Sequence, residues 1–347
     1  MNQAKTRPTI GLALGSGAAR GWSHIGVIRA LEEIGLRPDV VTGTSIGAVV
    51  AAAFAAGKLD VFEAWVRSLD RPTVLRLMDT RFSGTGGFIQ GVMLMKALEK
   101  IIGNPDIETL DVPFGCVATQ FGTGREVWLR KGKLLDAVRA SIALPGLVAP
   151  VQQNDHLLLD GGLVNPVPVS LTRAMGADIV IAVNLNGDLV GHDFFAMDLE
   201  EAPQALTATD SERTPEEFEL DIDEDEGLLD KWTERIKLGI ALRLDSWLSS
   251  ALRSEENSPG LLAIIIGAID IMQDRITRAR MAGEPPDVHI VPRLRHIGVM
   301  DFDRADIAIS EGHQAVRRET PELTALRKAL TRFDDEGPDE LATPITE

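Results

Sequence analysis

A pentapeptide centred on a serine is the part of the chain best suited to covalent chemistry. It reads Gly43-Thr44-Ser45-Ile46-Gly47, which is the pattern G-x-S-x-G. A β-branched run precedes it and an alanine-rich apolar stretch follows it, so it stands between a predicted strand and a predicted helix. Small residues at Gly43 and Gly47 permit a tight turn that lifts the Ser45 hydroxyl above the helix N-terminus, where the helix dipole favours an oxyanion. The pattern predicts a nucleophilic serine, and the alternative is a serine that only caps the helix.

A nucleophilic serine needs a general base, and histidine is the usual one. The chain has six histidines: His24, His156, His192, His289, His296 and His313. If the partners followed in the order serine, acid, histidine, the base would be one of the last three. His24, in the first predicted helix, is a further candidate, for which a packed, hydrogen-bonded histidine is the alternative.

Asp160 offers a base without histidine. It follows the apolar run 157–159 and precedes Gly161 and Gly162, so the sequence places it in a loop at the C-terminal end of a strand. Open α/β sheets carry their sites in such loops. A carboxylate within hydrogen-bond distance of Ser45 can take the hydroxyl proton directly. The alternative is a turn aspartate bonded to its own backbone.

A glycine-rich loop follows the first predicted strand, residues 9–14. Its residues are Gly15, Ser16, Gly17, Ala18, Ala19, Arg20 and Gly21. The third glycine stands one residue too late for the dinucleotide fingerprint G-x-G-x-x-G, and no G-K-[ST] follows, so neither a dinucleotide site nor a Walker loop is predicted. Closely spaced glycines before a helix leave backbone N–H groups free to bind a negative charge, including one that forms only in a transition state. A purely structural turn is the alternative.

The elements that carry these motifs alternate between strand and helix. The strand 9–14 and the helix 22–34 are followed by the strand 39–41 and the helix 46–56, which predicts a parallel sheet with helices on both faces. Further strands are expected at 114–119, 157–159, 179–184 and 288–292, and further helices at 94–102, 134–141, 168–175, 232–251, 261–282 and 311–330. We expect a single α/β domain over residues 8–333.

The acidic charge of the 347-residue chain is concentrated in one segment. The formal net charge is −17, and residues 187–230 contribute −15 of it through sixteen acidic side chains and one arginine. The rest of the chain is nearly neutral. A nucleic-acid-binding domain would need a basic face, and the bulk charge argues against one. Segment 187–230 lacks aliphatic periodicity and repels itself, so we expect a disordered or lid-like insertion, with a solvated loop or an acidic docking segment as alternatives. Residues 334–347 are expected to form a flexible tail.

The composition also limits the location of the protein and its contacts. A single cysteine, Cys116, excludes a disulfide framework and a multi-thiolate metal site. Residues 1–8 lack the apolar core of a signal peptide, and no apolar run approaches the ~20 residues of a membrane span, so a cytoplasmic protein is expected.

The helix 261–282 has an apolar face and basic residues that follow it closely. The apolar face consists of Leu261, Ile265, Ala268, Ile269, Met272 and Ile276, and the basic residues are Arg275, Arg278, Arg280, Arg293 and Arg295. Such a helix is suited to contact with a membrane surface or a second subunit. Packing of this face in the core is the alternative.

Taken together, the three motifs resemble the signature blocks of the patatin-like phospholipase family. The blocks are G-x-G-x-x-[KR]-G, G-x-S-x-G and D-G-[GA], and all three are intact and in order here. The similarity extends from Thr9 to Asn186, including the segments 141–145 and 165–168, and its early part resembles the compact bacterial members of the RssA type.

The resemblance implies a three-layer α/β/α fold with a mostly parallel sheet and a Ser–Asp dyad that uses no histidine, metal or cofactor. Ser45 would be the nucleophile and Asp160 the general base. Amides around Gly17 and Ala18 would form the oxyanion hole, with Arg20 supporting that loop. The implied substrates are acyl esters of membrane lipids, including phospholipids and lysophospholipids. The acidic segment corresponds to no feature of the family.

The function expected from the sequence is therefore a lipid acyl hydrolase of the phospholipase A or lysophospholipase type. An acyl-CoA thioesterase or small-ester carboxylesterase is the alternative enzyme, and a non-catalytic lipid-sensing scaffold is the alternative of another class. The expected partners are a lipid or acyl-ester substrate, the inner face of a membrane contacted peripherally, and a second copy of the chain, with no nucleic acid.

Overall fold

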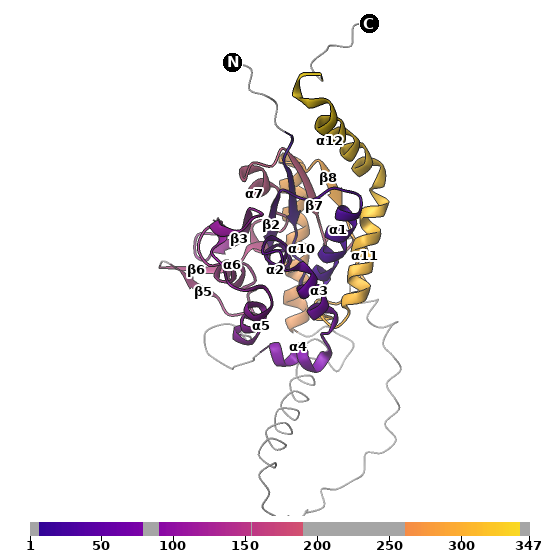
Figure 1. Ribbon diagram of the computed structural model, residues 1–347. Coiled ribbons are helices and arrows are strands. Elements are labelled where there is room, and N and C mark those ends of the chain that lie inside the picture. The colour runs from indigo at the N-terminus through magenta and orange to yellow at the C-terminus, as the bar shows by residue number, and fades with distance from the viewer. Residues whose placement is uncertain (1–6, 79–89, 154, 190–260, 341–347) are drawn as a thin grey trace, which may run out of the picture. The chain divides into compact units, whose positions relative to one another are not determined.

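Five parallel strands form the centre of the structure, a computed structural model that describes residues 7–78, 90–153, 155–189 and 261–340 (Figure 1). In the sheet they lie in the order β3-β2-β1-β7-β8. Their bounds are β1 (Ile10–Leu14), β2 (Val40–Thr44), β3 (Phe114–Gln120), β7 (Ile179–Val183) and β8 (Val288–Ile290). β1 and β2 are buried along their whole length, which explains why they read as unbroken apolar or small-residue runs.

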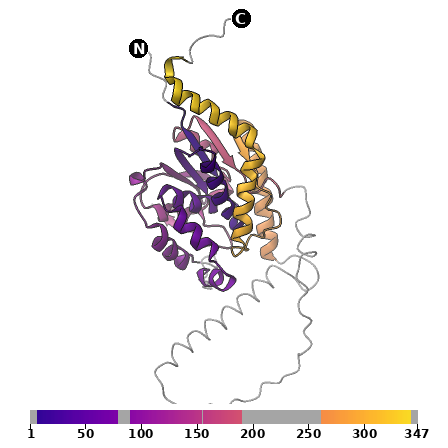
Figure 2. The same ribbon diagram turned by 45° about the vertical axis from the view of Figure 1, so that its right-hand side comes forward.

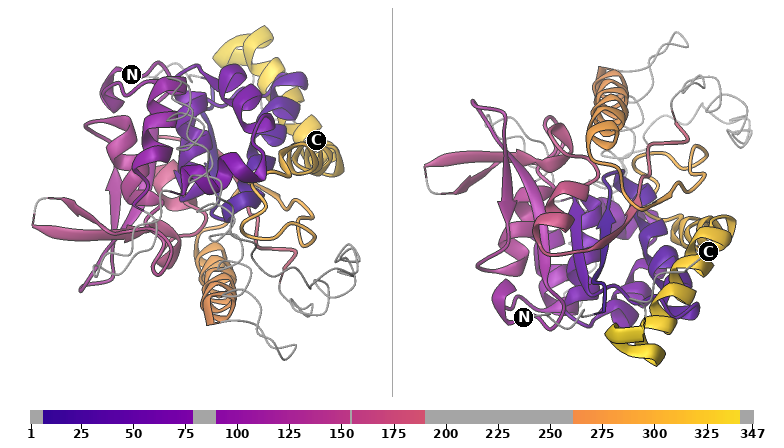
Figure 3. Two further views of the ribbon diagram at one scale, coloured as in Figure 1. Left: turned by 90° about the horizontal axis from the view of Figure 1, so that it is seen from below. Right: turned by 90° about the horizontal axis from the view of Figure 1, so that it is seen from above.

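Three antiparallel strands extend the sheet beyond β3. They are β4 (Arg125–Leu129), β5 (Val151–Gln153) and β6 (His156–Asp160). β6 pairs with β3 and β5 pairs with β6, whereas β4 pairs with β3. Figure 3 shows the β5–β6 hairpin extending away from the helices. The sheet is therefore mixed, with the parallel centre that the sequence predicted.

Helices cover both faces of this sheet. The α-helices are α1 (Ser23–Glu33), α2 (Ile46–Ala55), α3 (Leu59–Arg67), α4 (Arg71–Leu77), α5 (Val92–Ile102), α6 (Leu134–Ser141), α7 (Val169–Ala174), α10 (Leu261–Gly283), α11 (Ala305–Arg318) and α12 (Thr320–Glu340). Short 3-10 helices are η1 (Ala18–Trp22), η2 (Ile107–Thr109) and η3 (Gly161–Leu163).

Alternate residues of β1 belong to two separate hydrophobic cores. Leu12 and Leu14 lie in the larger core, which also contains residues of α1, α2, α6 and α11. Ala13 lies in the smaller one, with Val169 of α7. Because side chains of a strand alternate between its two faces, this division separates two helical layers with the sheet between them. The predicted α/β architecture is confirmed.

α1 and α11 pack so closely that glycine is required on both helices (Figure 2). A Cβ at Gly26 would lie 1.9 Å from the carbonyl oxygen of Ile309, and one at Gly312 would lie 1.9 Å from that of Ser23. Residues almost three hundred positions apart thus share one helix interface, which fixes the chain's last third against its first.

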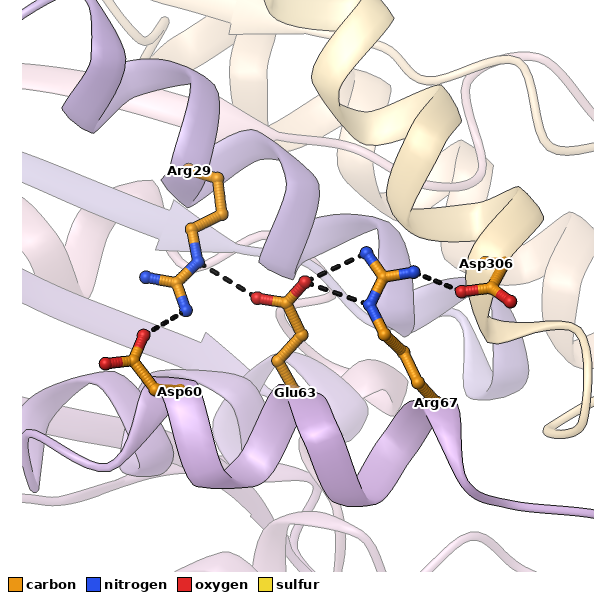
Figure 4. Close-up of polar contacts among 5 residues, drawn as sticks. All are labelled: Arg29, Asp60, Glu63, Arg67 and Asp306. Carbon is orange, nitrogen blue, oxygen red and sulfur yellow. Dashed lines mark hydrogen bonds and ion pairs between the residues drawn. The ribbon is translucent and has the colours of Figure 1, made fainter.

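A chain of ion pairs lies beside that interface and connects α1, α3 and α11 (Figure 4). Glu63 of α3 accepts from Arg29 of α1 at 3.0 Å and from Arg67 of its own helix at 2.9 Å. Arg29 also pairs with Asp60, and Arg67 pairs with Asp306 at the start of α11. Partly exposed pairs stabilise little singly, so this network mainly fixes the relative placement of the three helices.

Within the described residues, most predicted elements are found within a few residues of their expected bounds, but four α-helices and strands were not predicted and one predicted helix was wrong. α3, α4, β4 and β5 had no counterpart in the sequence analysis. The single helix expected at 311–330 is two helices, because α11 ends at Arg318 and α12 begins at Thr320 with Pro321 in its first turn. The predicted helix 232–251 lies outside the described residues.

The described residues up to 189 and from 268 onward belong to one compact unit of the chain, whereas the first seven residues of α10, 261–267, belong to another. Residues 190–230 of the acidic segment lie outside the described residues. α12 continues to Glu340, so it includes the first seven residues of the segment expected as a tail, 334–347. The single domain expected over residues 8–333 stays a prediction. Among the helices of the described ranges, none combines the length and the hydrophobicity of a transmembrane segment.

Candidate active site

Ser45 lies in a tight turn between β2 and α2. Its backbone has φ of +57°, a conformation that L-residues rarely adopt and that directs the side chain out of the turn. Gly43 and Gly47 make this turn sterically feasible. A Cβ at Gly43 would lie 2.4 Å from the carbonyl oxygen of Gly47, and one at Gly47 would lie 2.2 Å from that of Leu14. The expected strand–turn–helix context of Ser45 is thus present in the structure.

The Ser45 hydroxyl donates a hydrogen bond to the carboxylate of Asp160. The Oγ to Oδ2 distance is 2.5 Å, although the two residues are 115 positions apart. Sheet register explains the contact: Thr44 is paired with Val117 of β3, and the next residue of β3, Ala118, is paired with Asp160. The end of β2 and the end of β6 therefore lie at the same level, one strand apart.

Asp160 is fully buried and held by the backbone of its own loop. Its second carboxylate oxygen accepts from the N–H of Gly162 at 2.7 Å, and its carbonyl oxygen accepts from the Thr119 hydroxyl at 2.7 Å. Burial raises the pKa of Asp160 to about 6, and the hydrogen bonds from Ser45 and Gly162 oppose that rise. A carboxyl group with this pKa exchanges its proton near neutral pH, as a general base must.

Ser141, the last residue of α6, holds the backbone of Ser45. Its hydroxyl accepts from the N–H of Ser45 at 2.9 Å and donates to the carbonyl oxygen of Val117 at 2.7 Å. The side chain is fully buried. Ser141 had no role predicted from the sequence, in which segment 141–145 contributed only to the family resemblance.

The glycine loop between β1 and α1 lies against the start of α2. A Cβ at Gly21 would lie 2.2 Å from Ile46, the residue after Ser45. Four amides of the loop are paired with backbone carbonyls, those of Gly15, Ser16, Ala19 and Arg20. The two between them, at Gly17 and Ala18, have no acceptor among the described residues. Two free N–H groups beside a serine turn are suited to bind an oxyanion.

Arg20 anchors this loop and does not project a free charge. Its guanidinium is buried, donates to the carbonyl oxygen of Ile297 at 3.0 Å, and pairs with Asp270 of α10 at 3.1 Å. His24 also supports the loop, because its Nε2 lies 2.8 Å from the carbonyl oxygen of Gly15. Complete burial lowers the pKa of His24 to about 4, so its ring is neutral at pH 7.

In the part of the chain that the structure describes, no histidine hydrogen-bonds to Ser45. His24 contacts the glycine loop, His156 contacts Gln120, and His313 pairs with Glu33. His192 lies outside the described residues. Across these same ranges there is also no group of three or more acidic, histidine or cysteine side chains that could hold a metal ion.

α10 contacts the site with a polar face. The buried side chains of this face are Asp270, Gln273, Asp274 and Thr277. Two members of the apolar face noted in the sequence are exposed instead, Met272 by 50% and Ile265 by 38%. Ile269 is buried. Contact of this apolar face with a membrane or a second subunit stays a prediction.

Comparison with known proteins is consistent with the motifs. Residues 12–173 match the family described as patatin-like phospholipase, a range that includes Ser45 and Asp160. An uncharacterised NTE-family protein of Mycobacterium tuberculosis is 37% identical over 332 residues, which span 89% of this chain and 91% of that protein. Lysophospholipase NTE1 of Pyricularia oryzae is 29% identical over 339 residues, 93% of this chain but 20% of that protein. The crystal structure of VipD from Legionella pneumophila aligns with a TM-score of 0.34 and 14% identity, over 56% of this chain and 53% of that one.

Proposed function

Since this chain belongs to the patatin-like phospholipase family, and within it to the NTE-family proteins, we propose that it is a serine acyl hydrolase acting on lipid esters. The observation that carries the proposal is the 2.5 Å hydrogen bond from Ser45 Oγ to Asp160 Oδ2. A hydroxyl on a strained turn and a buried carboxylate with a raised pKa are the two groups that a direct proton transfer requires.

The positions of these groups support the following reaction. Asp160 takes the proton of Ser45 as the serine oxygen attacks the acyl carbonyl carbon. The carbonyl oxygen gains negative charge and accepts hydrogen bonds from the free amides of Gly17 and Ala18. Protonated Asp160 returns the proton to the departing alcohol, which leaves an acyl ester on Ser45. A water molecule, deprotonated by the same carboxylate, hydrolyses that ester and regenerates the hydroxyl.

The substrate class comes from the relatives. A protein similar over 93% of this chain is named a lysophospholipase, so a lysophospholipid is the first substrate to test. Acyl-CoA thioesters and short carboxylic esters present the same acyl carbonyl and are the competing substrates. Peripheral contact with a membrane, a second copy of the chain and a cytoplasmic location stay predictions from the sequence.

The proposal is tested with Ser45→Ala and Asp160→Asn. Each variant is expected to lose at least a thousandfold in fatty acid release from lysophosphatidylcholine and in cleavage of p-nitrophenyl esters, because each lacks one member of a pair that acts as a unit. Ser68→Ala is the matched control, since Ser68 is an exposed serine whose hydroxyl only caps a backbone carbonyl.

Labelling by a fluorophosphonate probe gives a second readout. Wild type and Ser68→Ala should be labelled on Ser45, and Ser45→Ala should not. Turnover that persists in either dyad variant would contradict the dyad. Failure of folded wild-type protein to react with any ester or with the probe would favour a non-catalytic lipid-sensing scaffold. Faster turnover of acyl-CoA than of lysophospholipid would reassign the substrate class.

A further inference from the structure

α10 contributes polar side chains to the glycine loop from a distant part of the sequence. The family match ends at residue 173, whereas α10 begins 88 positions later. The buried side chains of Asp270 and Gln273 stand three positions apart and so lie on one face of the helix. Both contact the same loop, the one whose free amides are the candidate oxyanion donors.

Gln273 connects three segments of the site. Its Oε1 accepts from the hydroxyl of Ser16 at 2.7 Å and from the Nδ2 of Asn186 at 3.0 Å. Its Nε2 packs so closely on Gly162 that a Cβ there would lie 2.5 Å from it. Ser16 precedes the free amides, and Gly162 donates to Asp160, so one amide side chain touches both halves of the site.

Asp270 holds the other end of the same loop. Its carboxylate pairs with Arg20 at 3.1 Å, and both side chains are buried. Gly17 and Ala18 therefore stand between two anchored residues, Ser16 bound by Gln273 and Arg20 bound by Asp270. Away from water these contacts are strong, and a partner left unpaired is unfavourable, so the two anchors restrict where the free amides can point.

We propose that Gln273 and Asp270 are positioning residues that hold the glycine loop in the geometry required to stabilise the oxyanion. This inference rests on the proposed acyl hydrolase function. Neither residue touches the reacting atoms. Each acts through a loop residue, and an amide displaced by a fraction of an ångström donates poorly to a transition-state oxygen.

The test compares substitutions that preserve volume and remove one contact. Gln273→Met keeps the shape of the side chain and removes the acceptor of Ser16 and Asn186. Asp270→Asn keeps the size and removes the charge paired with Arg20. Ile271→Met, on the exposed face of the same helix, is the control. Both test variants are expected to lose about tenfold in kcat on a p-nitrophenyl ester with KM within twofold of wild type, because the loop acts on the transition state.

Hydrogen exchange gives a readout that needs no turnover. The amides of Ser16 and Ala19 are bonded to the carbonyl oxygens of Pro166 and Val299, so they report the opening of the loop. Their exchange should accelerate about tenfold in Gln273→Met and in Asp270→Asn and remain unchanged in Ile271→Met. Acceleration confined to this loop supports positioning, whereas acceleration spread through the sheet strands means general destabilisation and overturns it.

The two hypotheses fail in different ways. If wild-type protein shows neither turnover nor probe labelling, the hydrolase function is refuted. The hydrogen-exchange data would then still test whether Gln273 and Asp270 hold the glycine loop. The positioning role would be overturned if the amides of Ser16 and Ala19 exchanged at the wild-type rate in both variants. It would also be overturned if kcat stayed within twofold of wild type in both. Asp270→Asn keeps the test decisive if Gln273→Met does not fold.

Discussion

Asp160→Asn changes one buried oxygen to nitrogen and leaves the shape of the site intact. The asparagine Oδ1 can still accept from the N–H of Gly162, and its Nδ2 can donate to Ser45 Oγ in place of the present acceptance. Only the ability to take a proton is lost. We therefore expect a folded, inactive protein whose stability differs from that of wild type in a pH-dependent way.

The size of this stability difference follows from the pKa of Asp160, which burial raises from 3.8 to about 6. A shift of about two pKa units corresponds to about 3 kcal/mol. Between these two pKa values the unfolded chain has released the proton while the folded protein retains it, so rising pH lowers the free energy of unfolding. Above pH 6 the full penalty of the buried charge is present. Asparagine carries no such charge, so the variant should be more stable by about 3 kcal/mol at pH 8 and by about half of that at pH 5.

Urea denaturation of both proteins at pH 5 and pH 8, followed by tryptophan fluorescence, measures this difference. Ser45→Ala is the control, because it is equally inactive but keeps the carboxylate, and its stability should not exceed that of wild type. The reasoning is refuted if Asp160→Asn is less stable than wild type at pH 8, or if the two stabilities differ equally at both pH values.

Three further predictions concern the pH profile, Ser141 and the α1–α11 interface. In wild type, kcat/KM on a p-nitrophenyl ester should rise about tenfold per pH unit below pH 6 and level off above it, because the proton acceptor must be ionised; a flat profile from pH 5 to 7 would contradict this. Ser141→Ala leaves the buried N–H of Ser45 without its acceptor and should lower the free energy of unfolding by about 1–3 kcal/mol and reduce kcat, as urea denaturation and kinetics can measure. Gly312→Ala should lower the free energy of unfolding by about 1–3 kcal/mol or more in urea denaturation, because the added Cβ would clash with the Ser23 carbonyl. Gly283→Ala, with open space at its Cβ, should leave that free energy unchanged.

Ser45, Asp160 and the glycine loop could be predicted from the sequence as candidate site residues because each carries a local signature. Glycines flank Ser45 where the chain must turn sharply, and two glycines follow Asp160 at the end of an apolar run. These local signatures do not show that the side chains of Ser45 and Asp160 are close in space. The contact between Ser45 and Asp160 depends on β3 lying between β2 and β6, which is a property of the sheet order.

What the sequence did not reveal is mostly long-range or polar. Gln273 and Asp270 lie about 250 positions from the loop they hold, and periodicity pointed to the opposite, apolar face of their helix. Polar side chains on a packed helix face give no hydrophobic signal. The break between α11 and α12 did have a local signal in Pro321, and α3 had one in the spacing of Leu59, Phe62 and Val66. Both features therefore follow from local patterns in the sequence.

The part of the chain before residue 190 and the part after residue 260 contact each other extensively. The covalent link through residues 190–260 is therefore not the main interaction that joins these two parts. β8 adds to β7, α11 packs on α1, and Asp270 pairs with Arg20, each joining a residue after 260 to one before 190. We therefore expect that a single cut of the backbone between residues 190 and 260 would leave two polypeptides held together by these contacts, as the subunits of a heterodimer are. They would separate only at concentrations low enough to overcome a shared sheet and a shared core.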